Sequence, residues 1–275
     1  MEHASAAFAP SVLQRWRRRE NLLPGLVLVA LAAAGWAYVA YEATSMGSAM
    51  GTTMAMGGTW GATLFLSSWT AMMVAMMVPA TLPLILLYRT IARNRLASVQ
   101  ARVGMVALLA GYVAVWAAAG VPVYAYSQFA GGVGSAAGVL PALLLILGGA
   151  YQFTPLKSIC HARCSSPLFF LMQNWRAGAG GALRLGTIHG FDCLGCCAGL
   201  MVGLVGLGVM NLAWMLSAAL IIFAEKTIPN SHRIATPLGV VMVAGGLVLL
   251  GASLYGGMMP GAGSTQQQGQ LLGSP

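Results

Sequence analysis

The 275-residue chain has few charged residues, and acidic residues are the scarcest of them. Lys, Arg, Asp and Glu together make up 7% of the chain, and only five residues are Asp or Glu. A soluble domain carries roughly 25% charged residues. Hydrophobic residues reach 58%, and the mean hydropathy is +0.78. These values exclude a soluble enzyme, a disordered chain and a collagen-like chain, and they favour a membrane protein with several spans.

The sequence also lacks the motifs of hydrolases and ATP-driven pumps. It contains no P-loop, no Gly-x-Ser-x-Gly and no His-Glu-x-x-His. A primary ATP-driven pump or a hydrolase is therefore unsupported. The net charge of +9 does not indicate nucleic-acid binding, because the basic residues fall in short blocks between apolar runs.

Apolar stretches recur along the chain with about the length of a bilayer crossing, which is about 20 residues. They cover residues 22–41, 60–88, 103–126, 139–157, 186–208, 209–225 and 236–256. We therefore predict an all-α fold, a polytopic transmembrane bundle of about seven spans. Pro79 and Pro83 are expected to kink or break the second stretch, and a tight turn is expected near Met210-Asn211. A helix face for close packing is predicted at Gly199, Gly203, Gly206 and Gly208.

The distribution of basic residues predicts the orientation. All 14 Lys and Arg residues precede the first stretch or lie in the segments after the second, fourth and sixth stretches. The positive-inside rule places these segments in the cytoplasm, so the N-terminus is inside and the C-terminus outside. We expect a cytoplasmic basic arm at 1–21, a transmembrane helical domain at 22–256 and a disordered outer tail at 257–275. This arrangement suits a multi-pass protein of the inner (plasma) membrane of a bacterium.

All five cysteines fall in two short motifs that also carry imidazole and carboxylate groups. On a helix, residues at i, i+4, i+7 and i+8 share one face. Both motifs lie at the predicted cytoplasmic ends of neighbouring stretches, so we expect them to meet. The candidate metal ligands are Cys160, Cys164, His189, Asp192, Cys193, Cys196 and Cys197.

Thiolate and imidazole groups bind Zn²⁺, Cu⁺ or an iron–sulfur cluster, and the spacing here is typical of no single one of these. A reducing cytosol favours thiols or metal binding over disulfides. The alternatives are thiol redox chemistry and simple helix packing, since cysteine also behaves as a small hydrophobe. Lys157, Arg163 or Arg184 are candidate partners for Asp192. We expect Lys157 and Glu225 to support the ligands by contact, although Glu225 and Lys226 also suit an interfacial pair.

The chain has 17 methionines, several of them at helical spacing. Thioether sulfur is a soft ligand that selects Cu⁺ over hard cations. A path for a soft metal would run from the charge-free outer loop along the second stretch, although methionine also fills gaps between helices. Its candidate residues are Met46, Met50, Met54, Met72, Met73, Met76 and Met77.

Three blocks of sequence resemble one known family. They are Trp69-Thr-Ala-Met-Met-Val-Ala-Met-Met-Val-Pro79, the segment from Tyr151 to Pro167 with its two cysteines, and Gly190-x-Asp-Cys-x-Gly-Cys-Cys197 leading to Glu225-Lys226. The segment 60–256 resembles a domain of unknown function described as predicted metal-binding integral membrane proteins. Ala198 stands where that family usually has an aromatic residue. The resemblance implies a metal-binding membrane protein.

Together, these features predict an integral membrane protein that binds copper or another soft cation, for transport, delivery or sensing. We expect copper in preference to zinc, and as partners the lipid bilayer, the metal ion and a membrane protein or metallochaperone, but no nucleic acid. Two alternatives remain at this point: a membrane thiol–disulfide oxidoreductase, and a non-catalytic assembly subunit whose motifs only pack helices.

The partition of basic residues makes a direct prediction about topology. A reporter enzyme that works only outside the cytoplasm should be active when it is fused after Pro275. The reason is that the N-terminus is predicted inside and an odd number of predicted spans separates it from the C-terminus. The same reporter fused before the first stretch serves as the control and should be inactive. A C-terminal fusion active only in the cytoplasm would contradict both the span count and the orientation.

Overall fold

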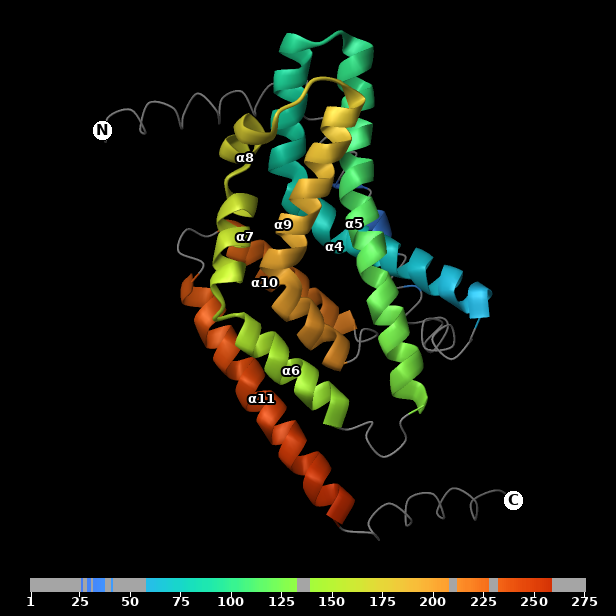
Figure 1. Cartoon of the computed structure of the whole chain (residues 1–275), viewed down its shortest axis with the longest axis vertical. Coiled ribbons are helices and arrows are strands. Elements are labelled where there is room, and N and C mark those ends of the chain that lie inside the picture. Colours follow the sequence, from blue (N-terminus) through green and yellow to red (C-terminus); the bar gives the residue numbers. More distant parts are fainter. Residues whose placement is uncertain are drawn as a thin grey trace. The chain divides into compact units, whose positions relative to one another are not determined.

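The computed structural model describes residues 58–132, 139–207, 212–227 and 232–258, together with 26, 29–30, 32–37 and 41. All elements in this part of the chain are helices (Figure 1), as the predicted all-α fold requires. They are α4 (Gly58–Arg95), α5 (Ser98–Gly132), α6 (Val139–Tyr151), α7 (Pro155–Ser165), α8 (Pro167–Asn174), α9 (Gly178–Leu207), α10 (Leu212–Thr227) and α11 (His232–Met258).

The described helices form two compact units, which are treated separately. Unit 1 lies within Met1–Pro122 and Ile159–Gly195, and unit 2 within Val123–Ser158 and Cys196–Pro275. The core of unit 1 is built by side chains of α4, α5, α8 and the first half of α9, including Leu84, Leu108 and Leu185. The ring of Tyr88 packs against that of Trp175 with their centroids 5.2 Å apart. Unit 1 therefore brings α9 into the same core as α4 and α5.

Helix α4 continues through both of its prolines. It spans 38 residues and contains Pro79 and Pro83, so the predicted break does not occur, although the helix does not run straight in Figure 1. Each proline removes one backbone donor and tends to bend a helix. A hydrogen bond from Trp69 Nε1 to the carbonyl of Trp116, 2.9 Å long, ties α4 to α5.

Unit 2 depends on close backbone contact between α6 and its neighbours α9 and α11. A Cβ atom added at Gly199 would lie 2.5 Å from the carbonyl oxygen of Gly148, and one at Gly206 would lie 2.8 Å from that of Pro141. A Cβ at Gly203 would collide with the end of Met242. These contacts confirm the predicted glycine packing face, of which Gly208 lies outside the described residues.

The stretch predicted as one straight span at 139–157 is broken. Helices α6 and α7 meet at an angle of 66°. Three successive turn bonds, among them Gln152 N–H to Gly149 O at 3.1 Å, close the end of α6, and Pro155 then begins α7. Proline disfavours helical backbone in the residue before it but suits the first position of a helix. The break follows from these preferences, which hydropathy does not detect.

Four described helices are long and apolar enough to cross a membrane, and a fifth crossing results if α6 and α7 form one bent span. The four are Gly58–Arg95, Ser98–Phe129, Gly178–Leu207 and Ile234–Tyr255. Helix α10 has 16 residues, and the first predicted stretch lies largely outside the described residues. Seven crossings and the orientation of the termini therefore stay predictions.

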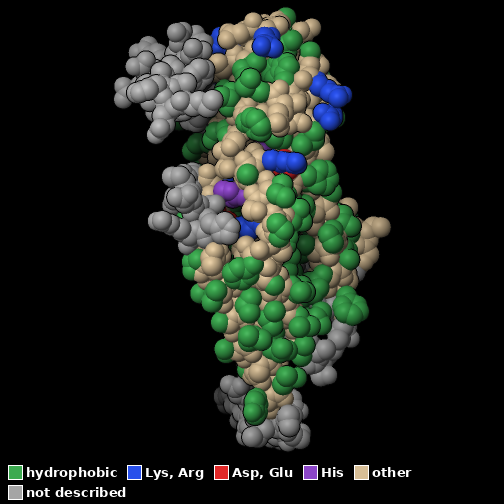
Figure 2. Space-filling model, turned by 60° about the vertical axis from the view of Figure 1, so that its left-hand side comes forward, with side chains coloured by type: hydrophobic (Ala, Val, Ile, Leu, Met, Phe, Trp, Pro, Cys, Tyr) green, Lys and Arg blue, Asp and Glu red, His purple; other side chains and the backbone are tan. Residues whose placement is uncertain are grey.

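The described surface carries many apolar side chains. Val106 on α5 and Val248 on α11 are 65% and 71% exposed, and Figure 2 shows hydrophobic side chains spread over the visible face. Lys and Arg side chains gather in that view at the end of unit 1 where α4 ends and α5 begins. An apolar surface with few charges is compatible with a protein that lies in a bilayer.

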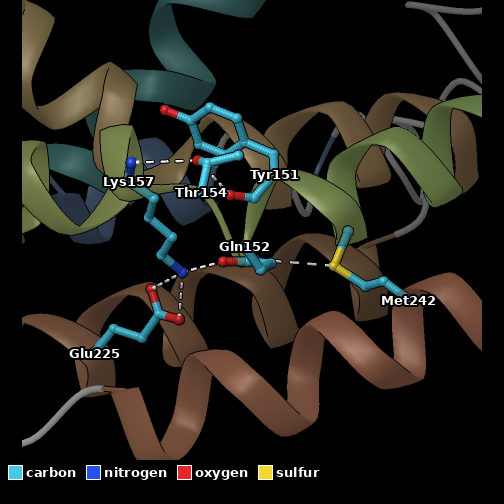
Figure 3. A network of polar contacts seen from close by, with 6 residues as sticks. All are labelled: Tyr151, Gln152, Thr154, Lys157, Glu225 and Met242. Carbon is cyan, nitrogen blue, oxygen red and sulfur yellow. Dashed lines mark hydrogen bonds and ion pairs between the residues drawn. The ribbon is translucent and has the colours of Figure 1, made fainter.

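A buried polar network in unit 2 fixes the start of α7 (Figure 3). Lys157 Nζ lies 2.9 Å from Oε1 and 3.1 Å from Oε2 of Glu225, and it also donates a hydrogen bond to Oε1 of Gln152. Gln152 Nε2 in turn contacts Met242 Sδ at 3.9 Å. Lys157 and Glu225 are almost fully buried, so this ion pair lies in the interior of unit 2. The network joins the break before α7 to α10 and α11.

The glycine contacts predict that a methyl group added at a closely packed glycine lowers the stability of the protein. Gly199→Ala is expected to lower the free energy of unfolding by about 1–3 kcal/mol, because overpacking forces backbones apart. Thermal unfolding in detergent micelles measures this change. Gly251→Ala is the control, since a Cβ at that position meets no neighbour within 4 Å. Equal behaviour of the two variants would contradict the packing argument.

The buried Lys157–Glu225 pair predicts that the stability of unit 2 depends strongly on keeping both charges or neither. Glu225→Gln should destabilise unit 2 by about 3–5 kcal/mol, because it leaves the ammonium of Lys157 buried beside a neutral group. The double variant Lys157→Met with Glu225→Leu removes both charges and should cost much less. Chemical unfolding of the three proteins in the same detergent tests this expectation. If the double variant were as unstable as the single one, the pair would not be energetically coupled.

Candidate metal centre

Helix α9 places two of the cysteines one turn apart. Cys193 and Cys196 are three residues apart on this helix, and both are buried. The helix approaches α5 closely at two glycines, since a Cβ at Gly190 would lie 2.9 Å from Cβ of Val115 and one at Gly186 would collide with the backbone of Leu108. The glycines thus hold the cysteine-bearing part of α9 against α5.

Helix α7 supplies the partner cysteine. Cys160 and Cys164 are four residues apart on this short helix, so they lie on the same face. Cys164 is buried, whereas Cys160 is half-buried. Ser166 follows the helix, and Pro167 begins α8. The two prolines that open α7 and α8 therefore limit α7 to the segment that carries both thiols.

Three sulfur atoms converge on one point. The Sγ atoms of Cys164, Cys193 and Cys196 all lie within 4.8 Å of one another, and all three residues are buried. Cys164 and Cys193 belong to unit 1, and Cys196 follows Cys193 on the same unbroken helix. Three sulfurs that bind one ion at about 2.3 Å lie about 4 Å from one another. The thiol cluster, meaning these three residues, therefore fits one metal ion with small adjustments.

The other predicted ligands are near the cluster in sequence but do not join it. On a helix, Cys196 and Cys197 point about 100° apart and flank the direction of Cys193. Cys197 is buried and is not one of the three residues whose sulfurs converge. His189 lies about 10 Å before Cys196 along the axis. Its ring packs between those of Tyr112 and Phe170, with centroids 5.8 Å and 5.2 Å away.

Asp192 forms an ion pair beside the cluster. Its Oδ1 lies 3.7 Å from Nη1 of Arg163, so Arg163, of the three predicted candidates, is the partner. Each of these residues directly precedes a cysteine of the cluster, Cys164 or Cys193. The second oxygen, Oδ2, is buried and accepts no hydrogen bond from the described residues. The pair connects α7 to α9 at the level of the thiols.

A tyrosine that the sequence analysis did not single out contacts the cluster. Tyr112 on α5 places its hydroxyl oxygen 3.2 Å from Sγ of Cys193 and 3.4 Å from the carbonyl oxygen of Met77 on α4. No local pattern marks this residue, because a tyrosine within an apolar helix is commonly a packing residue. Only the approach of α5 to α9 at the glycines brings its hydroxyl to the sulfur.

The remaining predicted residues divide into three groups. Lys157 and Glu225 bond to each other within unit 2. Met72, Met73, Met76 and Met77 are buried in α4. Met46, Met50 and Met54 lie outside the described residues. The outer part of the predicted metal path is therefore without structural description.

Comparison with known proteins gives one family. The family model PpoB2, described as a copper chaperone, matches residues 66–249, about two thirds of the chain. This region contains all five cysteines, Tyr112 and the buried methionines of α4. Neither the curated proteins nor the solved structures gave a match. The resemblance to a metal-binding family is thereby supported, and the chain belongs to the PpoB2 copper chaperone family.

Proposed function

We propose that this chain is an integral membrane copper chaperone that holds Cu⁺ in its thiol cluster. The observation that carries the proposal is the convergence of three buried sulfurs within 4.8 Å. Thiolates are soft ligands that select Cu⁺, and three of them suit an ion that accepts low coordination numbers. A structural Zn²⁺ site needs a fourth protein ligand, which the cluster does not supply among the described residues.

The route of the cargo follows from the exposure of the thiols. Cys160 is half-buried and lies one turn before Cys164 on α7, whereas the three thiols of the cluster are buried. We assign Cys160 as the thiol through which copper enters or leaves by ligand exchange. Each exchange replaces one Cu–S bond by another, so the ion need not become unligated in an apolar interior, where an isolated charge is costly.

A methionine path toward the cluster is the second part of the proposal. Tyr112 contacts both the Met77 carbonyl and Cys193, so the methionine-bearing turn of α4 lies next to the cluster within unit 1. Four methionines at positions 72, 73, 76 and 77 bring thioethers into this buried region. Weak thioether ligands would pass Cu⁺ toward the stronger thiolates. The outer methionines at 46, 50 and 54 would begin this path.

The cargo is then delivered to a partner metalloprotein or transporter at the cytoplasmic side, where the positive-inside rule places the cysteine motifs. The same thiols would also serve a thiol–disulfide oxidoreductase. That alternative requires a reversible disulfide among Cys164, Cys193 and Cys196, whose sulfurs lie within 4.8 Å of one another.

Single cysteine variants test the copper site. Cys164→Ser, Cys193→Ser and Cys196→Ser should each weaken Cu⁺ binding by more than about 100-fold, because losing a ligand exceeds the 10–100-fold effect of losing a supporting group. The measurement is competition with a Cu⁺ chelator under anaerobic, reducing conditions, with Zn²⁺ titrated in parallel.

Cys197→Ser provides the matched control. Cys197 is buried, adjacent to Cys196 and outside the cluster, so this variant should keep the affinity of the unchanged protein. If all four variants bind Cu⁺ equally well, the cluster only packs helices. If the thiols instead cycle through a disulfide in trapping experiments and bind no copper, the oxidoreductase alternative is correct.

A further inference from the structure

The hydroxyl of Tyr112 lies between two groups that can accept its single proton. One is the carbonyl oxygen of Met77 at 3.4 Å, and the other is Sγ of Cys193 at 3.2 Å. The residue is almost fully buried. Its ring is held by Trp116, at a centroid distance of 6.4 Å, and by His189 at 5.8 Å. The oxygen therefore has a fixed position, while the O–H bond is able to rotate.

Metal binding at Cys193 would decide which of its two neighbours the Tyr112 hydroxyl donates to. A thiol is itself a donor, so Cys193 can donate to the tyrosine oxygen while Tyr112 donates to the Met77 carbonyl. A sulfur bound to Cu⁺ has no proton and can only accept. On binding Cu⁺, Cys193 would release its thiol proton to solvent and form the S–Cu bond, and the tyrosine hydroxyl could then donate to the sulfur. No oxidation state changes in this step, and Tyr112 keeps its own proton.

We propose that Tyr112 is a positioning residue of the copper site, which donates a hydrogen bond to the metal-bound sulfur of Cys193. This inference rests on the copper site proposed above and adds a residue from α5 to it. Three thiolates around one Cu⁺ carry an excess of negative charge, and burial makes that excess costly. A hydrogen bond to a charged acceptor is stronger than one between neutral groups. The hydroxyl thus stabilises the loaded site more than the empty one.

Metal binding at Cys193 on α9 would also change a hydrogen bond that Tyr112 makes to α4. In the empty state the hydroxyl bonds to the Met77 backbone, and in the loaded state it leaves that carbonyl for the sulfur. Met77 belongs to the buried methionine group of α4. Loading of the cluster therefore removes one bond that holds the methionine-bearing turn, at the place where the proposed path reaches the thiols.

The first test is Tyr112→Phe, which keeps the ring contacts and removes the hydroxyl. Cu⁺ affinity, measured by competition with a Cu⁺ chelator, should fall by about 10-fold or more. The sulfur-to-copper charge-transfer absorption should move to longer wavelength, because the sulfur lone pairs rise in energy without the hydrogen bond. Tyr88→Phe is the matched control, as Tyr88 is a buried tyrosine of unit 1 whose ring packs on Trp175, and it should change neither quantity.

A double-variant cycle separates positioning from general stability. In a Cys193→Ala background, Tyr112→Phe should cause no further loss of Cu⁺ affinity, because its acceptor is gone. Equal losses in both backgrounds, or unchanged affinity and spectrum in Tyr112→Phe alone, would overturn the proposal. Should Tyr112→Phe fail to fold, a monofluorinated tyrosine at position 112 provides a stronger donor and should move the absorption to shorter wavelength. If the absorption band of the fluorotyrosine variant does not move, the hydrogen bond from Tyr112 to the sulfur is also refuted.

The measurements on the unchanged protein, Cys193→Ala and Tyr112→Phe test the copper site and the role of Tyr112 separately. If the unchanged protein binds no Cu⁺, or if Cys193→Ala binds it as tightly, the copper site itself is wrong. If the unchanged protein binds Cu⁺ and Cys193→Ala loses affinity while Tyr112→Phe does not, only the role of Tyr112 is refuted.

Discussion

The thiol cluster requires helices to pack at very short range, because a cysteine sulfur is only one bond beyond Cβ. Three such side chains can share one ion only where their backbones nearly touch. Cys164 on α7 meets Cys193 and Cys196 on α9 in this way. Helix α9 is itself held closely against α5 at Gly186 and Gly190, where small residues permit such approach although the hydrophobic effect contributes little to helix association. The thiol cluster thus depends on how α9 packs.

Buried charge is the second constraint, and the fold meets it by pairing. Lys157 and Glu225 are both buried and pair with each other, whereas the buried Asp192 pairs with the largely exposed Arg163. An unpaired charge in an apolar interior is costly, whereas a paired and hydrogen-bonded one is tolerated. Both pairs involve α7, at its start and beside Cys164. They define where this short helix begins and which residue of α9 it meets, and so they place its thiols without providing ligands.

The helical pattern of the sequence identified the cysteine-bearing face, but not which cysteines meet. Spacing along one helix shows that Cys193, Cys196 and Cys197 lie near one face, while the choice among them depends on the side from which α7 approaches. The break at Pro155 likewise depends on local backbone preferences that mean hydropathy averages away. Charge usually marks the ends of spans, so the sequence does not indicate that Lys157 is buried against Glu225, which lies 68 residues later in the chain.

The role of Tyr112 is the feature of the site that is hardest to predict from the sequence. Its identity and spacing are those of a packing residue, and its contact with Cys193 joins positions 81 residues apart. Its significance lies in the proton that it can direct to either of two acceptors. A chaperone must bind copper tightly enough to exclude competitors and yet release it. The proposed set of three thiolates with a hydrogen bond from Tyr112 would meet both demands, because that hydrogen bond could be withdrawn without breaking a metal–sulfur bond. The closed four-ligand geometry of a structural zinc site holds its ion for stability and leaves no such place for exchange.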